Sequence, residues 1–136
     1  MSYGVSTALQ QAVFQHLAAD PAIATLVGTA IYDAVPPGIV AGTYVSLGPE
    51  DVRDASDGTG HGALHEITVS VVTDAAGFSA AKAVATAVSD ALVDASLSLD
   101  RGALVYLNFH RARARRVQDA DVRRIDLKFR ARVQDI

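Results

Sequence analysis

The C-terminal part of the chain carries the pattern that most restricts its fold. Between residues 122 and 134, apolar and charged side chains alternate with little interruption. A period of two residues is typical of a β-strand with one buried and one solvent-exposed face. The pattern therefore predicts a strand in a sheet with a core on one side. The predicted inward set is Arg123, Ile125, Leu127, Phe129, Ala131 and Val133, and the predicted outward set is Arg124, Asp126, Lys128, Arg130 and Arg132.

Basic residues are concentrated in the same part of the chain. Nine of the twelve lysines and arginines lie in the last 26 positions, where four acids leave a net charge of +5. The first 110 residues carry three bases against eleven acids, a net charge of −8. Such asymmetry indicates contact with nucleic acid, with a membrane surface, or with a partner of opposite polarity. Because the arginines alternate with core residues, we expect them on a folded hairpin and not on a disordered tail.

The remaining elements follow from the spacing of apolar and β-forming residues. Helical spacing predicts helices over residues 5–19 and 78–94, with a short helical turn over 22–27 after Pro21. Alternating β-forming residues predict four strands, over residues 43–47, 64–73, 103–117 and 122–134. Short connections can join these elements in an α+β fold. We expect an antiparallel four-stranded sheet with two helices packed on one face. We expect residues 1–136 to form one domain.

Two expectations concern segments beside the predicted strands. Residues 50–62 hold four acids, three glycines and few apolar side chains, so they predict a long mobile loop between the first two strands. Simple alternation over residues 103–117 places the arginines of that strand on the same face as its apolar residues. The side chains that would share this face are Val105, Leu107, Phe109, Arg111, Arg113 and Arg115.

Three short motifs resemble catalytic or ligand-binding sites but lack a feature that such sites need. Gly58, Gly60 and Gly62 precede a strand, whereas phosphate-binding glycines follow a strand and open a helix. His61 and His65 would diverge in an extended chain and so would not share a metal ion. Ser79 follows a loop and not the sharp turn of a nucleophile elbow, which makes it a residue at the start of a helix. We therefore expect no enzymatic activity, no metal site and no cofactor.

Composition indicates the cellular compartment of the chain. No cysteine is present, which excludes disulfides and thiolate metal sites and is consistent with a reducing compartment. No apolar run approaches the length of a membrane span, and the first residues lack the pattern of a secretory signal. We expect a soluble protein made in the cytoplasm, with no membrane partner.

Three hypotheses remain for the role of the arginine-rich strands. They could protect a sheet edge from aggregation, bind nucleic acid through phosphates, or pair with acids of another copy across a subunit interface. No aromatic residue lies among the outward arginines to stack on bases, and the whole chain is acidic, so we favour the interface. The candidate interface cations are Arg113, Arg115, Arg124, Arg130 and Arg132, and their candidate acidic partners are Glu50, Asp51, Asp54 and Asp57.

Several of these segments, taken in order, resemble the tail-completion or tail-terminator proteins of phages and gene transfer agents. The similarity begins in the helix at Ala8 to Val13, continues at Leu17 to Pro21 and Tyr44 to Gly48, and includes the strand from His65 to Val71. It then runs through Ala76 to Phe78, Ala80 to Lys82, Asp90 to Leu92 and Leu104-Val105, and ends in the arginine-rich strand and Leu127 to Ala131. The resemblance covers nearly the whole chain.

That resemblance implies a structural role in a virion. Proteins of this family assemble as a ring, typically a hexamer, that caps the head-proximal end of the tail tube. The implied partners are further copies of the chain, the tail tube protein and the head-completion (stopper) protein. DNA would pass through the lumen without sequence-specific binding, and assembly in the host cytoplasm would leave the protein in the tail neck. The alternative is a small nucleic-acid-binding module that uses the basic C-terminal hairpin.

Overall fold

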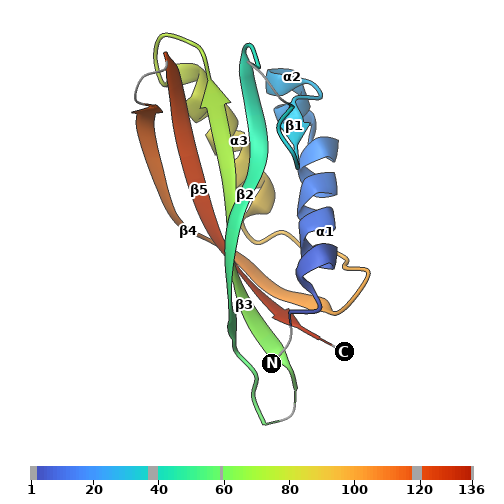
Figure 1. Cartoon of the computed structure of the whole chain (residues 1–136). Coiled ribbons are helices and arrows are strands. Elements are labelled where there is room, and N and C mark those ends of the chain that lie inside the picture. The colour runs from blue at the N-terminus through green and yellow to red at the C-terminus, as the bar shows by residue number, and fades with distance from the viewer. Residues whose placement is uncertain (1–2, 37–39, 59, 118–120, 136) are drawn as a thin grey trace.

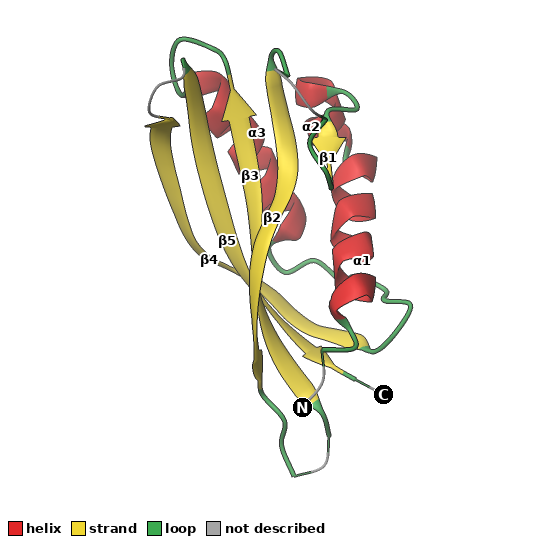
Figure 2. Cartoon of the chain, in the orientation of Figure 1, coloured by secondary structure: helices red, strands yellow, loops and turns green. Residues whose placement is uncertain are grey.

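The fold of the computed structural model is a twisted sheet with helices on one of its faces (Figure 1). The structure describes residues 3–36, 40–58, 60–117 and 121–135. Their elements follow in the order α1 (Ser6–Ala19), α2 (Pro21–Val27), β1 (Ile31–Tyr32), β2 (Thr43–Asp54), β3 (Gly62–Thr73), α3 (Ser79–Leu92), β4 (Ala103–Val117) and β5 (Val122–Gln134). The strand order is β1-β2-β3-β5-β4, and Figure 2 shows the three helices gathered on the same side of these strands. The predicted α+β class is confirmed.

Asp20 separates the first two helices. Its carboxylate accepts hydrogen bonds from the backbone N–H groups of Ala22 and Ile23, at 3.0 and 3.1 Å, and so caps α2. Pro21 occupies the first helical position, where its missing N–H costs nothing. Gly28 ends the helix with φ of 61°, a left-handed value that favours glycine. The predicted turn after Pro21 is therefore present as a seven-residue helix.

The strand β5 lies between β3 and β4 and contributes five buried apolar side chains to the core. Its side chains alternate as predicted, because Ile125, Leu127, Phe129, Ala131 and Val133 are each at most 4% exposed. They pack with buried residues of β3 and of the helices, among them Val69, Val71, Leu9 and Val88. The alternation read from the sequence correctly identified the inward face of this strand.

The sheet differs from the predicted one in strand number and direction. In the described part of the chain it has five strands and is mixed, so the prediction of four antiparallel strands was wrong. The additional strand is β1, which pairs in parallel with β2 through Ile31 to Val45 and Tyr32 to Ser46. A strand of two residues is too short to show periodicity, and only its position beside β2 reveals it.

The strand β2 is longer than predicted. It continues through Gly48 and Pro49 by a bulge, after which residues 50–54 pair with residues 63–67 of β3. The expected long loop over residues 50–62 was therefore wrong, and the connection between the strands spans residues 55–61. Backbone pairing to β3 compensates the ordering entropy that so polar a segment could not recover by burial. Part of this connection, residue 59, lies outside the described residues.

Two bulges in β4 overturn the predicted face of its arginines. The register shifts between Leu104 and Tyr106 and again between Phe109 and Arg111. Phe109 pairs with inward Phe129, whereas Arg111 pairs with outward Lys128. Each bulge adds one residue and so reverses the alternation. The arginines consequently lie on the face opposite Leu107 and Phe109, not on the same face. The predicted connection over residues 118–121 lies mostly outside the described residues.

The packing of the helices predicts a contrast between two leucines. Leu92 of α3 is 0% exposed and Leu26 of α2 is 46% exposed. Leu92→Ala should lower the free energy of unfolding by about 2–5 kcal/mol, because it removes buried methyl groups and leaves a cavity. The matched variant Leu26→Ala should cost less than about 1 kcal/mol. Chemical denaturation of both variants measures the difference, and equal losses would contradict the packing described here.

Candidate functional site

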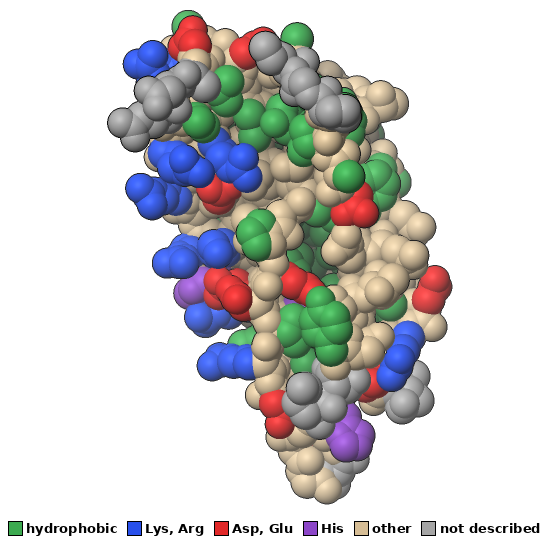
Figure 3. All heavy atoms as spheres, viewed as in Figure 1, with side chains coloured by type: hydrophobic (Ala, Val, Ile, Leu, Met, Phe, Trp, Pro, Cys, Tyr) green, Lys and Arg blue, Asp and Glu red, His purple; other side chains and the backbone are tan. Residues whose placement is uncertain are grey.

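The face of the sheet away from the helices carries most of the basic residues. Directly opposed residues of antiparallel strands share a face, and Arg111, Arg113 and Arg115 of β4 oppose Lys128, Asp126 and Arg124 of β5. Figure 3 shows the basic side chains gathered along one edge of the molecule, with acidic ones between them. We call this surface the basic face. It comprises Arg111, Arg113, Arg115, Arg124, Lys128, Arg130 and Arg132.

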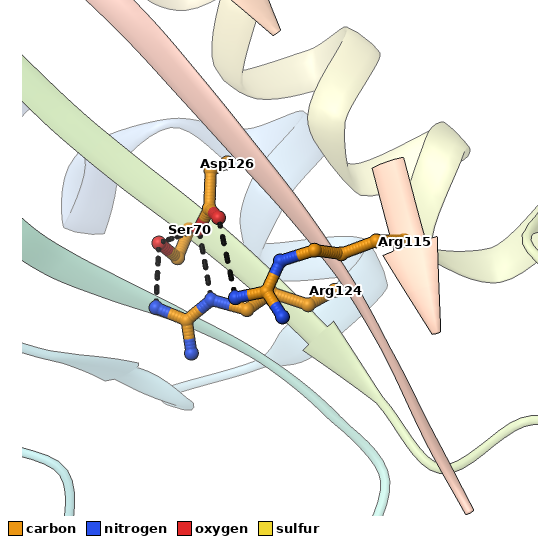
Figure 4. A network of polar contacts seen from close by, with 4 residues as sticks. All are labelled: Ser70, Arg115, Arg124 and Asp126. Atoms are coloured by element: carbon orange, nitrogen blue, oxygen red, sulfur yellow. Dashed lines mark hydrogen bonds and ion pairs between the residues drawn. The ribbon is translucent and has the colours of Figure 1, made fainter. Parts of the chain in front are cut away.

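Asp126 is the centre of a polar network within the basic face (Figure 4). Its Oδ1 accepts hydrogen bonds from Ser70 Oγ at 2.6 Å and from Arg124 Nε at 2.8 Å. Arg124 Nη2 also donates to Ser70 Oγ at 3.1 Å, and Arg115 Nη2 lies 3.9 Å from Asp126 Oδ2. Burial raises the pKa of Asp126, but the hydrogen bonds and the two guanidinium charges outweigh it and leave that pKa below its usual value. Arg115 and Arg124 are thus partly neutralised within their own chain.

Glu66 forms a second and looser group of charges. Its carboxylate lies 3.6 Å from Lys128 Nζ, 4.0 Å from Arg130 Nε and 3.8 Å from His110 Nε2. These side chains are 23–44% exposed, so water screens each ion pair and each contributes little to stability. Arg132 is held differently, because its Nη2 donates to the carbonyl of Ala55 at 2.6 Å. This hydrogen bond ties β5 to the connection after β2.

Arg111 and Arg113 differ from the other cations of the basic face. Both are exposed, and no hydrogen bond or ion pair joins either of them to another residue in the described ranges. With Arg115, Lys128, Ala112 and Asp126 they line an open groove on the surface. A guanidinium binds carboxylates and phosphates through two parallel hydrogen bonds. These two side chains are therefore available to an anion from outside the chain.

Glu50 points away from the basic face. It opposes inward Ile67, and its Oε1 accepts hydrogen bonds from Tyr3 Oη and Ser6 Oγ, each at 2.6 Å. Its Oε2 lies 3.4 Å from Nδ1 of His65, which is 0% exposed. Burial raises the pKa of Glu50, but the hydroxyl groups of Ser6 and Tyr3 and the nearby His65 outweigh it and lower that pKa. The structure thus engages Glu50 inside its own chain, beneath the start of α1.

The other three predicted acids are placed separately. Asp51 opposes Glu66, which puts it on the side of the basic face, and it is exposed. Asp54 accepts hydrogen bonds from the hydroxyl and the N–H of Ser56, at 2.6 and 3.1 Å, and these lower its pKa. Asp57 accepts one from the N–H of Gly60 at 2.9 Å. Asp54 and Asp57 therefore stabilise the turn after β2, while Asp51 faces solvent.

The sequence reasoning missed the two acids that contact the predicted cations most directly. Glu66 and Asp126 lie among Arg115, Arg124 and Arg130 within one chain. Alternation placed Asp126 in the predicted outward set, which was the available signal for that residue. Their partners depend on the register of β3, β5 and β4, which is set by long-range pairing and by the bulges.

The histidines of the sequence motif lie in separate surroundings in the structure. Among them, no three or more histidine, aspartate or glutamate side chains lie where they would hold a metal ion together. His65 is buried against Glu50, and His61 lies in the connection before β3. No helix in the described ranges has the length and apolar character to cross a membrane.

Comparison with known proteins adds a family and a structural relative. The family model described as Tail completion protein gp17 matches residues 11–134. A chain in the solved structure titled "Virion of native gene transfer agent (GTA) particle" is 69% identical in sequence and superposes with a TM-score of 0.92. That match covers 98% of this chain and 99% of the other. A search of curated proteins found no match.

The Asp126 network predicts a pH-dependent contribution to stability. Because the pKa of Asp126 is lowered in the folded chain, its stabilisation is present above the usual aspartate pKa of about 3.9 and is lost as pH falls through the lower folded value. Asp126→Asn should lower the free energy of unfolding by about 1–2 kcal/mol at pH 7, given its partial exposure. The difference from wild type should shrink below about pH 4.

Denaturant unfolding at pH 7 and at pH 3 measures this difference. Asp121→Asn is the control, because Asp121 is 82% exposed and forms long ion pairs of 3.7 and 3.9 Å. It should change stability by less than about 0.5 kcal/mol. A loss for Asp126→Asn that stays constant with pH would show that its cause is not the carboxylate charge.

Proposed function

Because this chain belongs to the Tail completion protein gp17 family, we propose that it is a tail terminator, a structural protein at the junction of tail and head in a virion-type particle. The observation that carries this proposal is the match to a chain of the gene transfer agent virion, at 69% identity over nearly the full length of both chains. The two chains superpose with a TM-score of 0.92, so equivalent positions have nearly the same backbone. The family role is structural and not enzymatic.

In this proposal the chain acts as a homo-oligomer, a ring of about six copies as the resemblance implies. The ring caps the tail tube, stops its growth and contacts the head-completion (stopper) protein. DNA passes through the lumen without sequence-specific binding. The particle is assembled in the host cytoplasm, and the protein remains in the tail neck.

The charge distribution supports contacts between copies. A closed ring of identical chains uses two different surfaces of each chain, one for each neighbour. The basic face offers Arg111 and Arg113 without partners among the described residues, and Asp51 offers an exposed carboxylate on β2, three strands away across the sheet. We assign the basic side of the interface to Arg111 together with the candidate cations Arg113, Arg115, Arg124, Arg130 and Arg132. Among the four candidate acids, Asp51 is the first choice for their partner on a neighbouring copy.

A second function is favoured by one observation. The groove lined by Arg111, Arg113, Arg115 and Lys128 presents four cations and one acid, a composition suited to phosphate. A nucleic-acid-binding module would use this groove on a single copy. The two functions differ in oligomeric state and in their dependence on salt.

Reversal of one charge on the basic face should weaken assembly. Arg113→Glu should raise the protomer concentration needed for half-assembly by about tenfold or more, because it replaces attraction to a neighbour's carboxylate by repulsion. Lys82→Glu, on the exposed side of α3, is the matched control and should have little effect. Mass photometry or sedimentation velocity measures the ring fraction. An unchanged ring fraction in Arg113→Glu would remove Arg113 from the interface.

Salt titration separates the terminator from the binding module. A module gripping phosphates through the four cations of the groove would bind DNA with a slope of log K against log salt of about −3 to −4. We expect instead weak binding that is no longer measurable at physiological salt. Fluorescence anisotropy with a labelled duplex provides the measurement. Tight binding by a monomer under those conditions would favour the module over the terminator.

A further inference from the structure

The last strand of the sheet has an edge that no described residue covers over part of its length. The strand β4 comes last in the strand order, and Figure 2 shows it at the margin of the sheet. Its first half is covered, because the backbone N–H of Asp94 donates to the carbonyl of Leu107 at 3.0 Å. Among the described residues, no backbone hydrogen bond outside the ladder with β5 involves residues 109–117. We call residues 111–116 the open edge.

The register shows which backbone groups of the open edge point outward. The N–H of Asp135 donates to the carbonyl of His61 at 2.8 Å, so odd-numbered residues of β5 direct their backbone groups toward β3 and even-numbered ones toward β4. After the second bulge of β4, the residues opposite odd-numbered positions of β5 are Ala112, Ala114 and Arg116. Their N–H and C=O groups therefore point away from the sheet.

The side chains of the open edge alternate between guanidinium and methyl groups. Arg111, Arg113 and Arg115 lie on the outer face, and Ala112 and Ala114 lie on the helix side. All five residues are exposed. A strand added to this edge would place alternate side chains beside the guanidinium groups and the remaining ones beside the alanines. The edge thus suits a strand with acids on one face and apolar residues on the other.

The apolar side of the open edge continues into an exposed phenylalanine. Phe109 lies on the helix side, opposite fully buried Phe129, yet it is 45% exposed. The two rings meet edge to face with centroids 5.9 Å apart, so the ring of Phe109 is held in place while much of it faces solvent. An ordered apolar ring beside two alanines gives the helix side of an added strand a surface to contact.

Charge disfavours the edges of a second copy as the added strand. Two open edges that met would set arginines directly opposite arginines, and like charges in that position are destabilising. The part of β2 beyond its bulge has Asp51 and Arg53 on the same outer face, because these residues oppose Glu66 and Leu64. Arg53 would therefore approach the arginines of the open edge. The charges select an acidic strand from a protein of different sequence.

We infer that the open edge binds an extended acidic segment of another protein, which adds to the sheet as an antiparallel strand. Its apolar residues oppose Ala112 and Ala114 and exchange backbone hydrogen bonds with them. Its acids oppose Arg113 and Arg115 in the pairs without hydrogen bonds, where side chains approach most closely. The backbone bonds provide affinity, and the charges select the partner. The ring contact proposed above uses charged side chains alone, so this inference goes beyond it.

A designed peptide tests the added strand on the full-length chain. The peptide alternates glutamate and valine over about seven residues, the length of the open edge. At saturating peptide, NMR should show hydrogen exchange slowed at least tenfold at the amides of Ala112 and Ala114, because these become donors to the peptide. The amides of Arg113 and Arg115 already bond to β5 and should change little. They are the internal reference.

Two control peptides separate strand addition from simple attraction of charge. A peptide with lysine in place of glutamate should not bind. A peptide with proline in place of valine keeps every carboxylate but lacks the N–H donors opposite Ala112 and Ala114, so it should bind at least tenfold more weakly. Equal binding of the proline peptide would overturn strand addition. So would a short DNA duplex that matches the affinity of the glutamate peptide without slowing any amide of the open edge.

Variants of the chain test the same hydrogen bonds from the other side. Ala114→Pro removes an outward N–H and leaves the ladder with β5 intact, a position where proline is tolerated, and it should weaken peptide binding at least tenfold. Arg113→Gln should weaken it about two- to fivefold, the effect of one cross-strand charge pair. Lys82→Gln removes the same charge from the exposed side of α3 and should leave binding unchanged.

The outcomes decide the inference without involving the ring. Slowed exchange at Ala112 and Ala114, with binding lost in Ala114→Pro, supports strand addition. Absence of binding by the glutamate peptide at millimolar concentration, or unchanged binding by Ala114→Pro, overturns it. Thermal unfolding checks that Ala114→Pro is folded, and the proline peptide tests the same bonds on the unaltered chain. The ring fraction of the wild-type chain without peptide tests the proposed function separately.

Discussion

The register of β5 between β3 and β4 is the constraint on which the rest of this structure depends. A slip of one residue would turn Ile125, Leu127 and Phe129 toward solvent and bring Arg124 and Asp126 into the core. The same register sets Asp126 opposite Ser70 on one side and Arg113 on the other. Core packing and surface charge are therefore determined by a single set of backbone hydrogen bonds, since they occupy the two faces of one strand.

That register also divides the arginines into two groups with different physical roles. Arg115, Arg124, Arg130 and Arg132 have partners in their own chain, and these contacts hold the outer face in one arrangement. Arg111 and Arg113 retain exposed guanidinium groups that have no partner in the described ranges. In the proposed ring both groups contribute, because a rigid charged surface loses little entropy when a neighbour binds its remaining free charges.

Three bulges give the sheet its asymmetry. The bulge at Gly48 and Pro49 lets β2 continue past a glycine-proline pair and pair with β3 as far as Asp54. The bulges in β4 turn Phe109 and Arg111 to opposite faces within two residues. At the β4 edge, the exposed ring of Phe109 and the exposed Arg111 therefore lie close together in sequence but on opposite faces. Each of these features arises from a single extra residue in a strand.

The sequence by itself determined the elements whose signals are local and repeated. Alternation in β5, helical spacing in α1 and α3, and the start of α2 at Pro21 each depend on near neighbours in the chain, so they were predictable. Only the tertiary structure decided the parallel pairing of β1, the continuation of β2 through Asp54, and the face on which Arg111 and Arg113 lie. Each of these follows from hydrogen bonds between strands distant in sequence, and one bulged residue reverses every side chain beyond it. For the same reason, the sequence indicated which residues carry the charge, while the fold decided which of them remain free to meet another molecule.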